Sequence, residues 1–324
     1  MKWNPIRFFI CTMLITTLVY GGAQAADISN SDIPEGSNFY VHVNLELIQS
    51  TEVGRRLMLD KIDEAVDEIQ DELSVNIREV IQGITVFGGS LPMRGSFESN
   101  GAVIFHGALG LDTQEGLLSA LERKGAEVSS MNSDGLTYYK VEEGDGTMTY
   151  TDEDGHSEDV DWGEREALYF SFGGTQTLVT QNLELMQTFL DAGGHLGGFE
   201  VVDPEALLVL QADRALVQGG ANTSIAIDSE WDSSVLKNVD AVALVISEEQ
   251  GGLQISAQLN AISADVAMSV RNIAEGLVAL KALDESEGVL GDILRQIRFE
   301  NDGSVLNVTV PVAADQVEAL RDNL

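Results

Sequence analysis

The chain has 324 residues and a formal net charge of −35, with 53 acidic residues against 18 lysines and arginines. A surface of this charge repels nucleic acid and anionic lipid, so we expect neither as a partner. Hydrophobic residues make up 44% of the sequence, which excludes a generally disordered chain and is enough for a folded core. The acidic, lysine-poor balance suits a marine or halophilic bacterium, and a calcium-rich extracellular setting is the alternative.

The first 25 residues have the pattern of a secretory signal peptide. Lys2 and Arg7 precede an apolar run over 8–20, and residues 23–25 supply the small side chains of a cleavage site. The run is shorter than the stretch of about 20 apolar residues that spans a bilayer. An uncleaved N-terminal anchor is the alternative. We therefore expect a periplasmic or secreted protein without a transmembrane segment after signal cleavage.

The only cysteine of the sequence, Cys11, lies inside this predicted signal peptide. Cleavage would leave a chain without disulfides, without thiol chemistry and without cysteine ligands for a metal or an iron–sulfur cluster. Such a protein must be held together by its hydrophobic core, and a chain of this length can form one.

In the first half, strands and helices alternate with polar breaks. Side chains alternate in character over 38–45, which predicts a strand, and apolar residues recur at helical spacing from Val53 to Leu73 behind a predicted cap at Ser50. The further predicted elements are strands over 83–91 and 101–110, a helix opened by Asp112, strands over 136–141 and 147–151, a hairpin over 167–181 turning at Gly173 and Gly174, and a helix capped by Asn182.

A glycine-dense stretch over 193–204 is the predicted linker between this half and the next. Beyond it, the same kinds of element return. They are a strand over 206–217, a hairpin over 240–261 around Gly251 and Gly252, a helix capped by Ser263, a helical stretch over 289–297, a strand over 304–312 and a last helix over 313–324.

The two halves share an order of strand, strand, short polar break and capped helix, and the leading strand and helix extend it to the ferredoxin-like β-α-β-β-α-β plan. We predict an α+β fold of two related modules, each an antiparallel sheet with helices on one face, the two sheets being packed or continuous. The predicted divisions are a signal peptide over 1–25, a first module over 26–192 with an acidic hairpin insert over 142–166, a linker over 193–204 and a second module over 205–324. One larger α+β domain is the alternative.

The acidic insert over 142–166 raises the question of a calcium site. In an EF-type loop with glycine at position 6, Asp152, Asp154 and Asp161 occupy positions 3, 5 and 12, but Tyr150 stands at position 1. The flanks also predict strands in place of helices. A solvated hairpin loop is the main interpretation, because runs of like charge mark exposed segments. A weak calcium site on the three aspartates is the alternative.

The sequence contains no nucleophile elbow, no Walker loop and no dinucleotide-binding fingerprint. Its acidic residues are too numerous for any one pair to indicate a glycosidase, so a secreted carboxylate-dependent hydrolase is an alternative without named residues. His42 and His106 lie in predicted strands, where a shared metal or a base–nucleophile pair is one hypothesis and packing in the sheet is the simpler one. We predict no enzyme, no catalytic residue and no cofactor beyond the calcium alternative.

The segment over 33–57 resembles the start of exported bacterial proteins of unknown function of the DUF3352-like kind. Ile33-Pro34, the apolar strand ending at Leu45 and the stretch from Ser50 to Gly54 carry the likeness, and the hairpin and helix over 167–191 are similar to a recurring unit of those proteins. The resemblance implies repeated α+β modules in an envelope protein without an established activity. We therefore expect a non-catalytic binding or interaction component of the cell envelope, whose partner binds a free sheet face or the groove between the modules.

Overall fold

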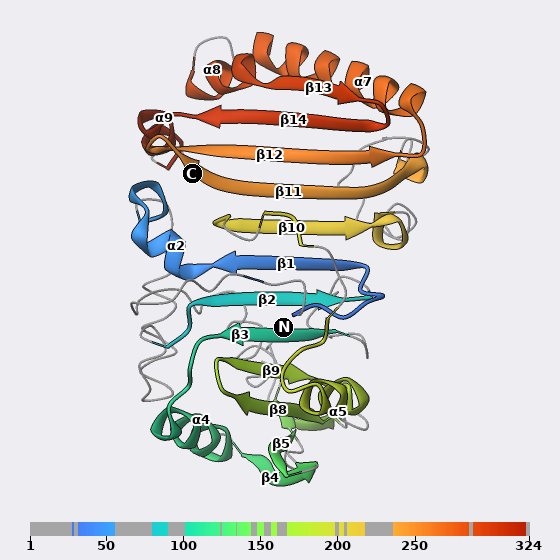
Figure 1. Ribbon diagram of the computed structural model, residues 1–324. Helices are drawn as coiled ribbons and strands as arrows, with labels where there is room; N and C mark the ends of the chain where they lie inside the picture. Colours follow the sequence, from blue (N-terminus) through green and yellow to red (C-terminus); the bar gives the residue numbers. More distant parts are fainter. Residues whose placement is uncertain are drawn as a thin grey trace.

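The computed structural model of the protein describes residues 28, 32–55, 80–89, 101–123, 125–133, 135–143, 148–151, 157–160, 167–197, 201–203, 206–217, 236–284 and 288–321 (Figure 1). The predicted signal peptide over 1–25 and the predicted helix beyond Arg55 lie outside these residues. Among the described residues, no helix is both long and apolar enough to cross a bilayer.

A twelve-stranded antiparallel sheet forms the centre of the molecule, in the order β13-β14-β12-β11-β10-β1-β2-β3-β9-β8-β5-β4 (Figure 1). A separate two-stranded sheet pairs β6 with β7. The strands are β1 (Phe39–Asn44), β2 (Gly83–Gly88), β3 (Ala102–His106), β4 (Ala126–Ser133), β5 (Leu136–Glu143), β6 (Met148–Thr151), β7 (Ser157–Val160), β8 (Leu168–Gly173), β9 (Gln176–Thr180), β10 (Leu208–Asp213), β11 (Val239–Glu249), β12 (Gly252–Ala261), β13 (Arg298–Asp302) and β14 (Val305–Val312).

In the second half the helices lie along the edge and the strand ends of this sheet, and in the first half two helices pack on its faces (Figure 1). They are α2 (Leu45–Ser50), α4 (Leu111–Arg123), α5 (Leu183–Asp191), the 3₁₀ turn η2 (Leu236–Asn238), α7 (Ala264–Asp284), α8 (Val289–Gln296) and α9 (Ala314–Arg321). The predicted α+β class with a dominant antiparallel sheet is confirmed.

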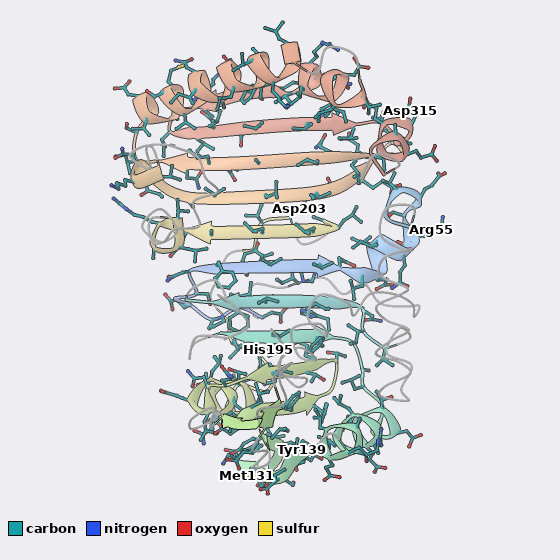
Figure 2. The ribbon with its side chains drawn as sticks, turned by 180° about the vertical axis from the view of Figure 1, so that it is seen from behind. Arg55, Met131, Tyr139, His195, Asp203 and Asp315 are labelled. Atoms are coloured by element: carbon teal, nitrogen blue, oxygen red, sulfur yellow. The ribbon has the colours of Figure 1, made fainter. Side chains whose placement is uncertain are left out.

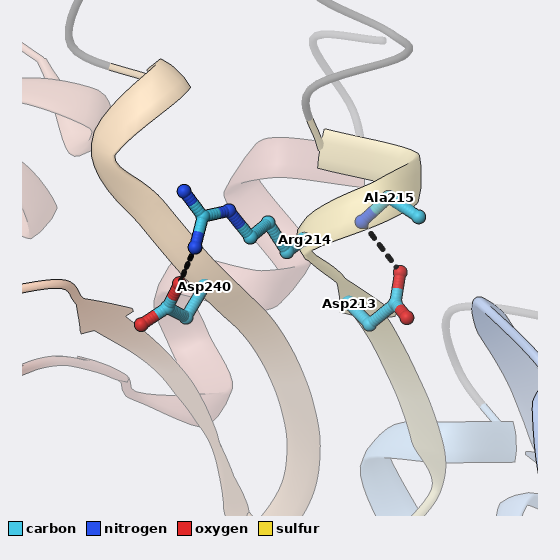
Figure 3. A network of polar contacts seen from close by, with 4 residues as sticks. All are labelled: Asp213, Arg214, Ala215 and Asp240. Atoms are coloured by element: carbon cyan, nitrogen blue, oxygen red, sulfur yellow. Dashed lines mark hydrogen bonds and ion pairs between the residues drawn. The ribbon is translucent and has the colours of Figure 1, made fainter.

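The two halves of the chain meet at the pairing of β1 with β10, which makes their sheets continuous. Val41 of β1 lies opposite Val86 of β2 on one side and Leu210 of β10 on the other. The ends of β10 and β11 are also joined by an ion pair between Arg214 and Asp240, whose nitrogen and oxygen are 3.2 Å apart (Figure 3). Both side chains are about half exposed, so solvent screens this pair and it contributes little stability.

In the first half, both faces of the sheet are covered. Every residue of β3 is buried. On one face Val103 packs in a cluster with Leu117 of α4, and on the opposite face Ile104 packs in a second cluster with Phe189 of α5. The prediction of helices on one face was therefore wrong. The physical reason is the run Ala102-Val103-Ile104-Phe105, which presents apolar side chains to both faces and requires cover on each.

Two helix caps lie at the residues that the sequence predicts. The Asn182 side chain accepts a hydrogen bond from the Leu185 backbone N–H at 3.1 Å, and Ser263 Oγ accepts one from the Val266 N–H at 3.4 Å. The short helix α2, capped by Asn44, was not predicted, whereas the helix predicted beyond Ser50 begins with the helical residues 52–55, where the Thr51 hydroxyl accepts a hydrogen bond from the Gly54 N–H at 3.2 Å. The hairpin between β11 and β12 turns through Gly251 at φ +79°, a conformation that favours glycine.

The predicted linker over 193–204 packs against the core where it is described. Leu196 is buried in the second cluster, and Val201 and Val202 pack against that cluster. The Val202 backbone N–H donates to the hydroxyl oxygen of the buried Tyr40 at 3.0 Å. This segment is therefore tied to β1 by apolar contact and by a hydrogen bond.

Candidate functional site

Three buried polar side chains form a row across adjacent strands of the first half. His42 on β1 and Thr85 on β2 are 0% exposed, and His106 on β3 is 5% exposed. The Thr85 hydroxyl oxygen lies 2.9 Å from His42 Nδ1 and 2.7 Å from His106 Nε2. The register places His42 directly opposite Thr85, and the two imidazole rings stand edge to face with centroids 5.4 Å apart.

The Thr85 hydroxyl can satisfy both imidazoles, because a hydroxyl carries one donor and two acceptor lone pairs. It either donates to one ring nitrogen and accepts an N–H from the other ring, or accepts an N–H from each. A buried polar group without a hydrogen bond is costly, so these three side chains are tolerated in the core because they bond to one another.

A carboxylate approaches this row from the segment that precedes β1. Asp32 is 2% exposed, and its Oδ1 accepts a hydrogen bond from Gln176 Nε2 at 2.8 Å. Gln176 lies opposite His106 in the β3–β9 pairing. Burial lowers the pKa of His106, and the Asp32 carboxylate opposes that shift. His106 is therefore a neutral imidazole at neutral pH.

The arrangement does not support the hypothesis that His42 and His106 share a metal or act as a base–nucleophile pair. The two histidines do not lie on neighbouring strands, because β2 separates them and Thr85 occupies the position between their nitrogens. No group of three or more metal-binding side chains occurs in the described part of the chain. All three members of the row are buried. The row is a structural polar network that fixes the register of β1, β2 and β3.

The acidic insert is described only in its strands. Met148 lies opposite Val160 and Thr151 opposite Ser157 in the β6–β7 pairing, so a hairpin flanks the loop. Strands at these positions agree with the predicted hairpin and differ from the helices of an EF-hand. The three aspartates of the calcium alternative, Asp152, Asp154 and Asp161, lie outside the described residues.

A pocket of about 460 Å³ lies between the β8–β9 turn and the C-terminal end of α5. Phe172, Gly174, Phe189 and His195 line it. Among the described residues that line it, His195 is the titratable one. A single imidazole supplies no acid–base pair or nucleophile, so this pocket lacks the constellation that general acid–base or covalent catalysis needs.

One face of the sheet in the second half is apolar and incompletely covered. A cross-strand ladder of half-buried side chains runs over five adjacent strands, each residue directly opposite the next. Its members are Val41, Leu210, Leu244, Ala257 and Val308. We call this ladder the apolar face. It contrasts with β3, whose residues are buried throughout.

The opposite face of these strands is mixed: β10 and β11 place the buried Val209, Ala243 and Val245 on it, whereas β12 is polar there. On β12 it carries Gln254, Ser256, Gln258 and Asn260, and all of them are half-buried. In both views of the molecule, the described helices lie along the edges and strand ends of this half and none of them is drawn across the middle of β10, β11 and β12 (Figures 1 and 2). The sheet of the second half therefore has one apolar face and an opposite face that is polar on β12.

Comparisons with known proteins give no family. No family model matches the chain, and no curated protein matches it. Three of the solved structures to which the chain is similar, each at 9% sequence identity, are crystal forms of TP0453. Crystal form III has a TM-score of 0.45 over 93% of this chain and 99% of that chain, form IV has 0.48 over 90% and 94%, and form I has 0.48 over 91% and 97%. The DUF3352-like resemblance stays a prediction.

Proposed function

We propose that the protein is an exported, non-catalytic, acidic component of the bacterial cell envelope that binds a partner protein or other envelope component through the apolar face. The single observation that carries this proposal is the half-buried ladder from Val41 to Val308. A monomeric protein rarely leaves a large contiguous apolar patch uncovered, and such patches mark interaction sites.

The charge of the chain supports the same function. A net charge of −35 keeps copies of the protein apart, although the apolar face is only half-buried. Binding then depends on removing apolar side chains from water, which stabilises a complex by about 25 cal/mol per Å² of buried apolar area. The net negative charge of the chain disfavours non-specific association, so binding is restricted to a partner whose own surface fits this face.

The finer prediction of two related modules belongs to this proposal. The order β2, β3, α4 in the first half and β11, β12, α7 in the second half supports a common hairpin–helix unit. The proposal is limited to that shared order, because the continuous sheet does not confirm a ferredoxin-like plan within each half. Periplasmic or secreted localisation is part of the same proposal and comes from the pattern of residues 1–25.

The test of the binding surface is a titration of the native protein with the neutral, apolar dye Nile red. We expect saturable fluorescence enhancement that Leu244→Gln reduces, because a polar amide then interrupts the ladder. Gln258→Ala on the polar face of the neighbouring strand is the matched control and should leave dye binding unchanged. Equal enhancement by both variants, with unchanged melting temperatures, would place dye binding elsewhere and contradict the proposal.

The non-catalytic part has its own test in a panel of esterase, glycosidase, peptidase and phosphatase substrates. We expect no turnover above buffer. Reproducible turnover that co-purifies with the protein and follows its concentration would overturn this part and favour the carboxylate-dependent hydrolase.

A further inference from the structure

The pocket between the β8–β9 turn and the C-terminal end of α5 reaches from the surface into the core of the first half. Its volume of about 460 Å³ lies within the range of about 300–1,000 Å³ that is usual for ligand sites. Ser171 and Phe189 line it although each is only 1% exposed, and Leu190 lines it at 5%, so these three residues form its floor. Leu136, which is 45% exposed, and the exposed His195 form its mouth.

The local structure explains why the floor and the mouth come together. Ser171 lies directly opposite Leu178 in the β8–β9 pairing, and Leu178 packs in the same cluster as Phe189, so Ser171 is on the face of the sheet that α5 covers. After the end of α5 the chain turns through Gly194 at φ +94°, a conformation that favours glycine. His195 follows this turn, four residues beyond the end of α5 (Figure 2).

The hydroxyl of Ser171 makes no hydrogen bond within the described residues. The hydroxyl of Thr180, which is also buried, instead donates to the Gly101 carbonyl at 2.9 Å. A buried hydroxyl without a partner is costly, so its place at the floor indicates a partner that enters the pocket. Water can supply that bond, but the neighbouring Phe189 and Leu190 favour a molecule that also has an apolar body.

The lining offers no fixed charge to an ionic ligand. No aspartate, glutamate, lysine or arginine occurs among the described residues that line the pocket. Asp32 bonds to the lining residue Gln176 at 2.8 Å and is not itself part of the lining. The net charge of −35 repels an anion over the whole surface.

The end of α5 does not call for a cation either. A helix C-terminus is negative because its last carbonyls lack partners within the helix. Here the Phe189 carbonyl accepts a hydrogen bond from the Gly194 N–H at 2.8 Å, and the Leu190 carbonyl accepts one from the Gly193 N–H at 2.9 Å. With these carbonyls bonded and no acidic side chain in the described lining, the chemistry of the pocket fits an uncharged molecule.

We propose that this pocket binds a small uncharged aromatic molecule that carries one hydroxyl or carbonyl oxygen. The ring packs against Phe189 and Leu190 at the floor, and the removal of its apolar surface from water supplies most of the affinity. The oxygen bonds to the Ser171 hydroxyl, which can donate or accept, and this bond sets the orientation of the ring.

This role is binding without chemistry. Ser171 lies at the floor and His195 at the mouth, and within the described residues no hydrogen bond joins them, so no base activates the hydroxyl as a nucleophile. The pocket also shares no residue with the ladder of the apolar face. A failure of this inference would therefore leave the proposed function untouched.

The experiment is a fluorine NMR titration of the purified protein with 4-fluorobenzyl alcohol. We expect saturable binding that is about fivefold tighter than that of 4-fluorotoluene, which lacks the hydroxyl. Ser171→Ala should weaken binding of the alcohol about fivefold and leave binding of 4-fluorotoluene unchanged. Thr177→Val is the matched control, because it removes a buried hydroxyl of the neighbouring strand that lies outside the lining, and it should change neither affinity.

A second pair of variants tests the place of binding from the surface. Leu136→Trp fills the mouth and should weaken binding of both compounds about tenfold or more. Met131→Trp is its matched control, because Met131 is 40% exposed, lies opposite Tyr138 on the same face as Leu136 and is outside the lining. Met131→Trp should bind as the unmodified protein does.

Several results would overturn the proposal. They are no saturable binding of the alcohol, an equal loss of both compounds in Ser171→Ala, or equal effects of the two tryptophan variants. Tighter binding of 4-fluorobenzylammonium than of the alcohol, persisting at high salt, would overturn it as well, since the pocket would then be a site for a cation.

Discussion

Replacement of Thr85 by valine tests whether the buried row of His42, Thr85 and His106 stabilises the fold. Valine has nearly the shape of threonine, so the core keeps its packing, and the change removes only the hydroxyl on which two imidazole nitrogens converge at 2.9 and 2.7 Å. Loss of a partner for a buried polar group costs about 1–3 kcal/mol. Two such losses, offset by about 1 kcal/mol because the hydroxyl is no longer buried, predict that the free energy of unfolding falls by about 1–5 kcal/mol.

The assay is urea unfolding at neutral pH, followed by far-ultraviolet circular dichroism, for the unmodified protein and for three variants. Thr177→Val is the matched control, because Thr177 is 3% exposed and its hydroxyl makes no hydrogen bond within the described residues. We expect it to change the stability by less than about 0.5 kcal/mol. Thr85→Ser keeps the hydroxyl and should lose only about 1 kcal/mol for the missing methyl group. If Thr85→Val were no more destabilising than Thr177→Val, the row would not be a stabilising network.

Three further predictions concern titration and calcium. Because burial lowers the pKa of His106 below its usual value, the unfolded state binds more protons than the folded state under mildly acidic conditions. The unfolding free energy should therefore keep its full value above about pH 6.5 and decrease below that pH. In urea titrations, His106→Gln should reduce the slope of this decrease by up to about 1.4 kcal/mol per pH unit. Burial raises the pKa of Tyr40 to about 12, so the unfolding free energy should fall as the pH rises from about 10 toward 12. Tyr40→Phe should remove the last tyrosinate step in an absorbance titration. The same variant should cost about 1 kcal/mol of stability at neutral pH, because the Val202 N–H loses its acceptor. At matched ionic strength, calcium should raise the melting temperature no more than magnesium does, as the predicted solvated loop over 142–166 requires. A calcium-specific rise that Asp154→Asn abolishes would establish a site there.

Local signals in the sequence predicted most of the elements, because caps and turns depend on neighbouring residues. Asn182 and Ser263 act as predicted, and the hairpin turn falls at Gly251. The sequence failed for β4 and β13, which no pattern indicated. Both are edge strands of the sheet, and polar or charged residues fill them, so they lack the alternation that marks a half-buried strand.

The candidate sites depend on register, which a single sequence does not contain. His42 and His106 were visible in two strands, but only the pairing of both strands with β2 places Thr85 between them. The apolar face was hidden for a different reason. Leu244 lies in a nearly continuous apolar run, and such a run predicts burial on both faces, whereas the amount of cover depends on where the helices lie.

The central claim, that a partner in the envelope covers the apolar face, is tested most directly by site-specific photo-cross-linking in the host cell. A photoreactive amino acid in place of Leu244 reports on the apolar face, and the same amino acid in place of Gln258, on the neighbouring strand, reports on the polar face. The account predicts one discrete cross-linked product from Leu244 that is absent from Gln258 and that Leu210→Gln diminishes. Products of equal yield from both positions, or none from Leu244 in folded and exported protein, would contradict it.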